Sequence, residues 1–303
     1  MSRMLEGLRG SRGRDHARRL ALSPACWGIS EQNGWGHQLD TERVLSEAAA
    51  VGEGAITAGP PGFLPNRSDH ARSVLRRNRL AVVAGQVHAV LHIHEQRGPE
   101  LAHIDGHAHW LSAIGAGTLV LSAIWDRGPV TAAEASERPQ WAHVAHFVGS
   151  VEHVCARHRL RLAVMPRFGG TIQGPEHIER LLVGTEAGLC LDLAQLALVG
   201  ADPLDVVQEA AGRIVHVHLN DLDRELARGV RERSVTYADA VASGLFKPIG
   251  EGSIDVRRIT SALKTAGYTG WFTLEEETRL ATSSERPLGR ISRSLEFVLP
   301  LLG

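Results

Sequence analysis

Cysteine is scarce in this chain, and neither sign of charge dominates it. The three cysteines, Cys26, Cys155 and Cys190, are too far apart to form a zinc-binding spacing, and their odd number fits a reducing compartment better than a disulfide framework. The formal net charge of −1 gives no indication of a nucleic-acid or anionic-membrane partner. No uncharged stretch approaches the ~20 residues that a bilayer-spanning helix requires. We therefore expect a cytoplasmic protein that binds a small molecule, with homo-oligomer formation left open.

The start of the chain differs from the rest because arginine is concentrated there. Glu6 and Asp15 interrupt the positive charge and no apolar segment follows, so a secretory signal is not expected. We predict that residues 1–19 form a disordered basic extension, since chain termini often lack order. No linker divides the remainder, so residues 20–303 are expected to form one domain. The arginines concerned are Arg3, Arg9, Arg12, Arg14, Arg18 and Arg19.

Short apolar segments alternate with helical patterns along the whole domain. Eight such units over about 250 residues predict a single (β/α)₈ TIM barrel. An open doubly wound sheet would carry a glycine-rich loop after its first strand, and Cys26-Trp27-Gly28-Ile29-Ser30 is no such loop. The polar stretch 224–252 is expected to be a long loop over the barrel mouth. The expected strands are Leu20–Cys26, Gly54–Ala58, Leu80–His92, Thr118–Ile124, Leu160–Val164, Leu189–Asp192, Ile214–Leu219 and Trp271–Leu274. The expected helices are Thr41–Val51, Ser68–Arg77, Glu100–Gly115, Gln140–His158, Pro175–Gly184, Pro203–Gly212, Ile254–Gly267 and Ser284–Leu301.

Three polar side chains stand where expected strands end: Asp192, His218 and Glu275. Each would be unfavourable to bury alone, and the carboxyl ends of barrel strands share one pocket. Asp, His and Glu are common ligands of divalent cations, so these three residues predict a metal site. A hydrogen-bonded polar cluster without metal is the alternative.

Other strand-end or neighbouring residues are weaker candidates. His92 ends the third strand and could act in acid–base chemistry or orient a substrate, or it could be a core histidine. Trp27, Phe63 and Trp125 could form an apolar wall of the pocket, although aromatic core packing is an equal alternative. His216 lies two residues before His218 on the same strand face and is expected to be a core histidine.

Several motifs together resemble inosose (2-keto-myo-inositol) dehydratases, within the wider sugar-phosphate isomerase/epimerase, or xylose isomerase-like, barrels. The resemblance implies a (β/α)₈ barrel with a Mn, Mg or Co ion that holds vicinal oxygens of a polyol ketone and acidifies the neighbouring C–H. It also implies that Asp192, His218 and Glu275 occupy the last three ligand positions. The motifs are Trp27-Gly28, Gly59-Pro60-Pro61-Gly62-Phe63-Leu64-Pro65, Val90-Leu91-His92, His216-Val217-His218-Leu219-Asn220-Asp221, Ile249-Gly250-Glu251-Gly252-Ser253-Ile254-Asp255 and Gly270-Trp271.

The chain departs from this family at the remaining ligand. Where the family carries Glu or a His-Pro-His pattern after strand five, this chain has Met165-Pro166-Arg167. Gln195 stands where a histidine is usual, and Asn220 where a lysine is usual. A thioether is a poor ligand for a hard cation, so a divalent ion (Mn, Mg, Co or Zn) is either held by three side chains or absent. In its absence Arg167 would supply the positive charge, or would bind an anionic group of the substrate.

These residues predict an isomerase, epimerase or dehydratase that abstracts a proton next to a carbonyl of a sugar-, cyclitol- or keto-acid-like substrate. Glu275 is the expected base or ligand, His218 and His92 the acid–base candidates, and Arg167 the group that stabilises an enolate. Gln195 and Asn220 are expected to bind substrate. Two alternatives remain: a metal-free biosynthetic enzyme that rearranges or cyclises a non-sugar substrate, and an inactive small-molecule-binding barrel. A DNA-repair endonuclease is disfavoured by the near-neutral charge.

Overall fold

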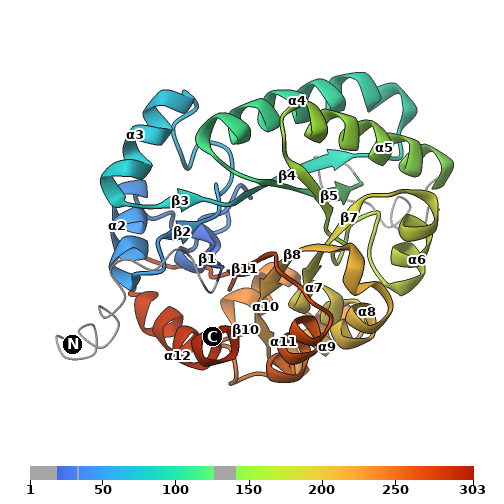
Figure 1. Ribbon diagram of the computed structural model, residues 1–303. Helices are drawn as coiled ribbons and strands as arrows, with labels where there is room; N and C mark the ends of the chain where they lie inside the picture. The colour runs from blue at the N-terminus through green and yellow to red at the C-terminus, as the bar shows by residue number, and fades with distance from the viewer. Residues whose placement is uncertain (1–18, 33, 126–140) are drawn as a thin grey trace.

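The central feature of the computed structural model is a closed barrel of parallel strands surrounded by helices (Figure 1). The structure describes residues 19–32, 34–125 and 141–303, so nearly all of the predicted N-terminal extension lies outside it. The predicted (β/α)₈ barrel is confirmed. In spatial order the strands are β3 (Ala81–Val82), β2 (Ala55–Ile56), β1 (Leu20–Leu22), β11 (Trp271–Leu274), β8 (Ile214–Leu219), β7 (Gly188–Asp192), β6 (Arg161–Val164), β5 (Thr118–Ile124) and β4 (Ala84–Val90).

The ring closes through a bend in one continuous segment. The predicted third strand is split at Val83: its first half, β3, pairs with β2, and its second half, β4, pairs with β5. The backbone of Val83 forms hydrogen bonds on both sides of the bend: its amide donates to Ile56 O of β2, and its carbonyl accepts from Gly117 N, just before β5. The nine assigned strands are therefore equivalent to the eight of a (β/α)₈ barrel.

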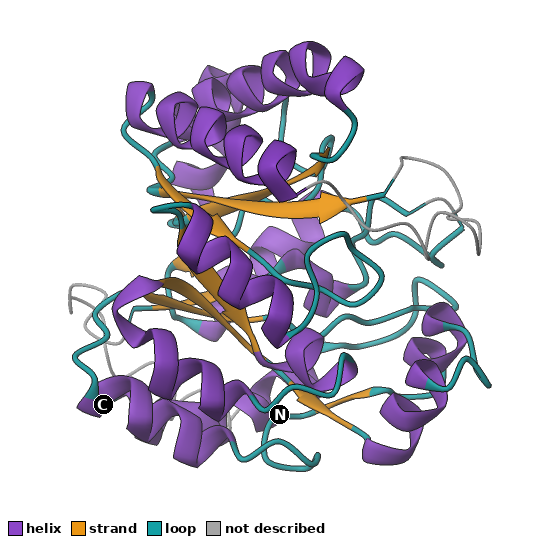
Figure 2. Ribbon diagram, turned by 90° about the vertical axis from the view of Figure 1, so that its right-hand side faces the viewer, coloured by secondary structure: helices purple, strands orange, loops and turns teal. Residues whose placement is uncertain are grey.

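The surrounding helices begin and end where the sequence places good caps. Asp40 accepts hydrogen bonds from the first turn of α2, and Gly52 ends that helix with a positive φ. Pro175 and Pro203 open α6 and α8. Figure 2 shows the same arrangement from the side, with helices outside the strands. The helices of this layer are α2 (Thr41–Val51), α3 (Ser68–Asn78), α4 (Arg97–Ile114), α5 (Trp141–Arg157), α6 (Pro175–Gly184), α7 (Leu193–Leu198), α8 (Pro203–Ala210), α11 (Val256–Thr265) and α12 (Leu288–Leu302).

The apolar core is divided between a large outer layer and a smaller inner one. The outer cluster lies between strands and helices and contains most of the buried leucines and valines. Gly85 permits this packing on one side, because a Cβ there would come within 2.3 Å of Leu111 on α4. The inner cluster consists mainly of small side chains, which leaves room for a cavity. Its members are Ala21, Ala55, Val83, Ala84, Val120, Ala163, Met165, Cys190 and Val215.

The stretch predicted as a long loop after strand seven is mostly structured, which corrects that expectation. It contains α9 (Arg224–Arg231), α10 (Tyr237–Ala242) and β10 (Phe246–Lys247), and β10 pairs antiparallel with β9 (Asp221–Leu222), which directly precedes the stretch. Its apolar side chains form a separate cluster that also includes Trp35 from the β1–α2 loop. These short helices are polar on their outer face, so the sequence pattern did not indicate that their inner faces form a small core.

Strand β1 is shorter than predicted, which changes the position of Trp27. It ends at Leu22, and Ser23 then caps a short 3₁₀ helix, Pro24–Trp27. The early end follows from Pro24, which has no N–H to donate to a neighbouring strand. Trp27 therefore does not lie at a strand end.

Candidate active site

A cavity of about 230 Å³ lies at the carboxyl ends of the barrel strands. This is the end at which active sites of (β/α)₈ barrels are built. The wall is formed by strand ends and by two covering segments, the β1–α2 loop with Trp35 and helix α10 with Tyr237. The rings of these two residues lie 6.3 Å apart between centroids. The polar side chains lining the cavity include Glu31, Gln86, His88, Arg167, Asp192, Gln195, His218, Tyr237, Glu275 and Glu277.

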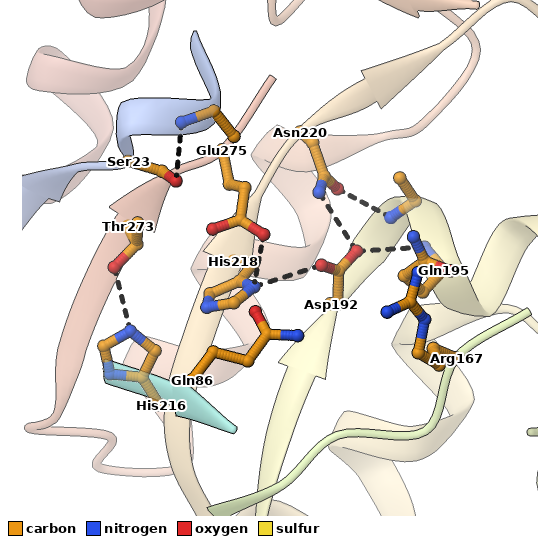
Figure 3. A network of polar contacts seen from close by, with 12 residues as sticks. Ser23, Gln86, Arg167, Asp192, Gln195, His216, His218, Asn220, Thr273 and Glu275 are labelled. Carbon is orange, nitrogen blue, oxygen red and sulfur yellow. Dashed lines mark hydrogen bonds and ion pairs between the residues drawn. The ribbon is translucent and has the colours of Figure 1, made fainter. Parts of the chain in front are cut away.

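Asp192, His218 and Glu275 converge in this cavity, as the sequence predicts (Figure 3). His218 Nδ1 lies 3.1 Å from Asp192 Oδ2 and 3.3 Å from Glu275 Oε1. All three residues are at the ends of adjacent parallel strands: Asp192 is opposite His218 in the β7–β8 register, and Glu275 directly follows β11. Parallel pairing thus brings together residues that are up to 83 positions apart.

Asp192 is held rigidly by the elements that follow it. It is the N-cap of α7, and its Oδ1 accepts hydrogen bonds from Gln195 N at 2.9 Å and from Asn220 Nδ2 at 3.0 Å. Asn220 Oδ1 in turn accepts from Ala194 N at 2.6 Å. Oδ1 of Asp192 therefore accepts two hydrogen bonds, while Oδ2 faces His218.

The charges within this cluster support one another despite burial. Burial disfavours the imidazolium of His218, but the Cys190 sulfur and the carboxylates of Glu275 and Asp192 outweigh it, and the pKa of His218 lies well above its ordinary value. Burial likewise opposes ionisation of Glu275, but His218, a hydrogen bond from Ser23 and the charge of Arg167 hold its pKa below the ordinary value. The cluster thus places one imidazole between two carboxylate side chains, those of Asp192 and Glu275.

The same three donor atoms also fit a divalent cation. The ligand atoms all lie within 4.8 Å of one another. Two ligands on a tetrahedral zinc are about 3.4 Å apart, given bond lengths near 2.1 Å. The separations of 3.1 and 3.3 Å around His218 Nδ1 are close to that value. A cation in this position would replace the proton that His218 Nδ1 now shares with the carboxylates.

Met165 and Arg167 both line the cavity, so the departures from the family pattern lie within the site itself. Met165 is buried and belongs to the inner apolar cluster. Arg167 Nη1 lies 2.8 Å from His88 Nε2, and its charge acts on both Glu275 and Glu277. Arg167 therefore brings a permanent positive charge into a cavity rich in carboxylates.

The three consecutive glutamates after β11 have different environments. Glu275 and Glu277 line the cavity. Burial raises the pKa of Glu277 to about 7, opposed by Arg167 and reinforced by Glu275, and Tyr237 is its hydrogen-bond partner. Glu276 points away towards α12, where Ser294 Oγ and Arg290 contact it. Successive side chains thus point to opposite sides, as in an extended strand.

The three predicted aromatic residues and His92 do not reach the cavity. Trp27 is fully buried and its Nε1 donates to Glu47 at 2.8 Å, and Phe63 is core, packed against Gly59. His92 and Trp125 pack against each other edge to face, 5.0 Å apart. None of the four is among the lining residues, which corrects the prediction of an aromatic wall and places His92 away from the cavity. The physical reason is that strand β4 ends at Val90, before His92.

Gln195 and Asn220 have different positions relative to the cavity. Gln195 lines it, but its Oε1 accepts from Phe168 N at 3.0 Å. Asn220 is buried behind Asp192 and is not a lining residue. Asn220 therefore positions a predicted ligand, where the sequence suggested a substrate contact.

Sequence reasoning missed Gln86 and His88, which both reach the cavity from β4. Two polar residues spaced by two in an apolar strand share one face, and that spacing is the signal that could have found them. Glu31 and Tyr237 were also missed as lining residues. Glu31 and Tyr237 come from connecting segments, whose placement depends on tertiary contacts.

The fold and the arrangement of the site define the class of protein. The family described as xylose isomerase-like TIM barrel matches residues 34–300, and the chain belongs to it. Among its relatives is an inosose dehydratase from Geobacillus thermodenitrificans, 27% identical over 274 residues that cover 86% of this chain and 89% of the relative.

Solved structures show the same fold. The 3-keto-D-glucoside 4-epimerase YcjR from E. coli superposes with a TM-score of 0.68 at 14% identity, covering 93% of this chain and 99% of that one. The IOLI protein, solved with a bound zinc atom, superposes with a TM-score of 0.67 at 13% identity, covering 94% and 98%.

These comparisons confirm two predictions. The family resemblance is confirmed, and the chain is an enzyme of the isomerase, epimerase or dehydratase class. A divalent metal remains compatible with the site, since this chain brings three ligand types together. No helix in the described part of the chain is long and apolar enough to cross a membrane.

Proposed function

We propose that this enzyme removes a proton from the carbon next to a carbonyl of a small polyhydroxylated ketone, such as a keto-cyclitol, and then either returns a proton or expels water. The observation that carries the proposal is the convergence of Asp192, His218 and Glu275 beside Arg167 in one small cavity. Inosose dehydratase among the relatives supports a cyclitol-like substrate.

Each side chain of the site has its own role in the proposed reaction. Glu275 takes the proton, because it is ionised and faces the cavity. Arg167 stabilises the negative charge that develops on the substrate oxygen, which a guanidinium does without changing its own protonation. Asp192, His218 and Glu275 would hold a divalent cation, and a bound cation would polarise the carbonyl. Asn220 keeps Asp192 oriented throughout.

A metal-free version of the same chemistry is the second candidate. Met165 in the cavity wall and the ready-made pairing of the His218 imidazolium with two carboxylates favour it. In this version Arg167 and His218 together supply the positive charge.

The test combines substrate exchange with metal analysis. Wild-type enzyme is incubated with 2-keto-myo-inositol in D₂O, and deuterium incorporation and loss of water are followed by NMR and mass spectrometry. Glu275→Gln should lower exchange by about 10²–10⁴-fold, the contribution typical of a general base. The exposed Glu176→Gln, which forms only an i,i+4 pair with Arg180, should leave it unchanged.

Elemental analysis and chelation separate the two versions. Stoichiometric Mn, Co, Zn or Mg with exchange lost after EDTA supports the metal-dependent enzyme. Exchange that persists in fully chelated protein supports the metal-free one. Absence of any exchange by wild type with this ketone, with or without added metal, would contradict the proposed function.

A further inference from the structure

His88 and Glu31 form a carboxylate–imidazole pair on a different wall of the cavity from Glu275. His88 points inward from β4 and lines the cavity. Its Nδ1 is paired with Oε1 of Glu31, which comes from the β1–α2 loop. In the barrel, β4 and β11 are separated by β1 and β2, with β3 running on into β4. The cavity is thus bordered by proton-transfer groups on two sides.

The hydrogen bonds of His88 determine which ring nitrogen carries the proton in this arrangement. Arg167 Nη1 lies 2.8 Å from His88 Nε2, and a guanidinium nitrogen can only donate. Nε2 is therefore the acceptor, and Nδ1 carries the hydrogen that is donated to Glu31. Gln86, two residues earlier on the same strand, also reaches Nε2, at 3.1 Å. Glu31 and Arg167 together fix both the tautomer and the orientation of the ring.

We propose that His88, oriented by Glu31, is the second acid–base group of the enzyme and works on the side of the substrate away from Glu275. The proposal rests on the proposed function and adds the residue that completes it. Nothing in the Asp192–His218–Glu275 cluster supplies a proton donor on this wall, because those side chains come from β7, β8 and β11.

The proton balance of the reaction requires such a group. Glu275 accepts the proton of the C–H bond, and the bonding electrons pass into an enolate. His88 Nε2 takes up one proton from water when the substrate displaces Arg167 from it. In dehydration the hydroxyl on the next carbon leaves with its bonding electrons, and this Nε2 proton joins it to make water. In epimerisation the same Nε2 proton goes to carbon on the opposite face. Glu275 ends with one proton more and His88 with one fewer, and both exchange with water before the next turnover.

Arg167 and Glu31 make this role feasible. When a substrate oxyanion takes over the Arg167 hydrogen bond, Nε2 can carry a proton directed at the substrate. The imidazolium is then stabilised by the carboxylate on Nδ1, in the same way as in other carboxylate–histidine pairs. Glu31 is partly exposed, with 47% of its side-chain surface accessible, so the pair connects the cavity with solvent. Glu31 is a positioning residue in this scheme.

The decisive experiment separates C–H exchange from product formation, with 2-keto-myo-inositol in D₂O as the probe. His88→Gln should keep deuterium incorporation within about 3-fold of wild type while net dehydration or epimerisation falls by about 10²-fold or more, the usual contribution of one acid–base group. His37→Gln, an exposed histidine on the loop that carries Glu31, is the matched control and should behave as wild type. A parallel loss of exchange and product in a folded His88→Gln, or unchanged product formation, would overturn the proposal.

Glu31 is tested by the same ratio of exchange to product. Glu31→Ala should lower product formation with exchange retained, and Glu31→Gln, which still accepts from Nδ1, should lower it less. Equal effects of the two substitutions would contradict the positioning role.

A substrate-independent measurement keeps the two proposals distinguishable. Imidazole ¹⁵N NMR of the wild-type chain should show His88 as the Nδ1–H tautomer, and Glu31→Ala should abolish that preference. An Nε2–H tautomer in wild type would refute the pair even if the enzyme proves active. If wild type shows no exchange but the tautomer is as expected, the proposed function fails and the geometry of the pair stands.

Discussion

At the scale of single residues, the site depends on side chains that hold the candidate ligands in place. Asn220 shows this best: its amide donates to Asp192 and accepts from the backbone of α7, so it joins two strand ends through one buried side chain. Residues in this position behind a ligand fix its orientation and tune its affinity. The sequence marked Asn220 as unusual but could not distinguish a substrate contact from a support.

Asn220→Ala provides a stability and binding test of this support. Loss of both hydrogen bonds leaves the buried Ala194 N–H unsatisfied and removes one of the two donors to Asp192 Oδ1, which should lower the free energy of unfolding by about 1–3 kcal/mol. Zn²⁺ or Mn²⁺ affinity, measured by isothermal titration calorimetry, should fall by about 10–100-fold if the three ligands bind metal. The exposed Asn66→Ala is the control. Unaltered stability and affinity in Asn220→Ala would show that Asn220 is not a support.

At the scale of elements, the segment after β8 is anchored by one buried carboxylate. Asp221 accepts from four backbone amides at 2.9–3.0 Å, those of Leu222, Gly250, Gly252 and Ile254. The two glycines are required by this geometry: Gly250 has φ +93°, and a Cβ on Gly252 would lie 2.2 Å from Asp221 Oδ1. The Gly250-Glu251-Gly252 motif thus attaches the segment that contains α9, α10 and β10 to the end of β8.

Asp221→Ala should release that attachment. Several buried amides would lose their acceptor at once, so the free energy of unfolding should fall by at least about 3 kcal/mol. Hydrogen–deuterium exchange of residues 246–256 should rise more than that of the barrel strands. Asp40→Ala, which removes the N-cap of α2, should lower stability by about 0.5–2 kcal/mol and serves as the comparison. Equal exchange of residues 246–256 in both variants would argue against the anchor.

At the scale of the whole molecule, two histidines with a buried ring nitrogen, His107 and His216, make the fold sensitive to acid. Burial, with a smaller effect of His103, lowers the pKa of His107 on α4 to about 4, and burial lowers that of His216 well below its ordinary value. Both side chains are neutral in the fold. Above about pH 6.5 neither the folded nor the unfolded state binds these protons, so stability is undiminished. As the pH falls from about 6.5 to 4 the unfolded state binds them first, and stability is lost.

The His107 contribution can be isolated by titration of stability. A pKa of about 4 against an ordinary 6.5 corresponds to a loss on the order of 3 kcal/mol by about pH 4. Urea denaturation of His107→Gln between pH 7 and 4 should therefore show a flatter decline than wild type, whatever its absolute stability. The exposed His70→Gln should decline as wild type does. An identical slope for His107→Gln and wild type would rule out this linkage.

The sequence by itself determined the barrel and the central cluster. Strands β5, β8 and β11 and helices α2 and α6 have their predicted bounds, because apolar runs and caps are local signals. Asp192, His218 and Glu275 were predictable together because parallel strands of a barrel all end at one mouth. Only the tertiary structure decided the remaining lining: Glu31 and Tyr237 reach the cavity from connecting segments, and Trp27 turns out to be core. Connecting segments take their positions from long-range contacts, which no local pattern in the chain encodes.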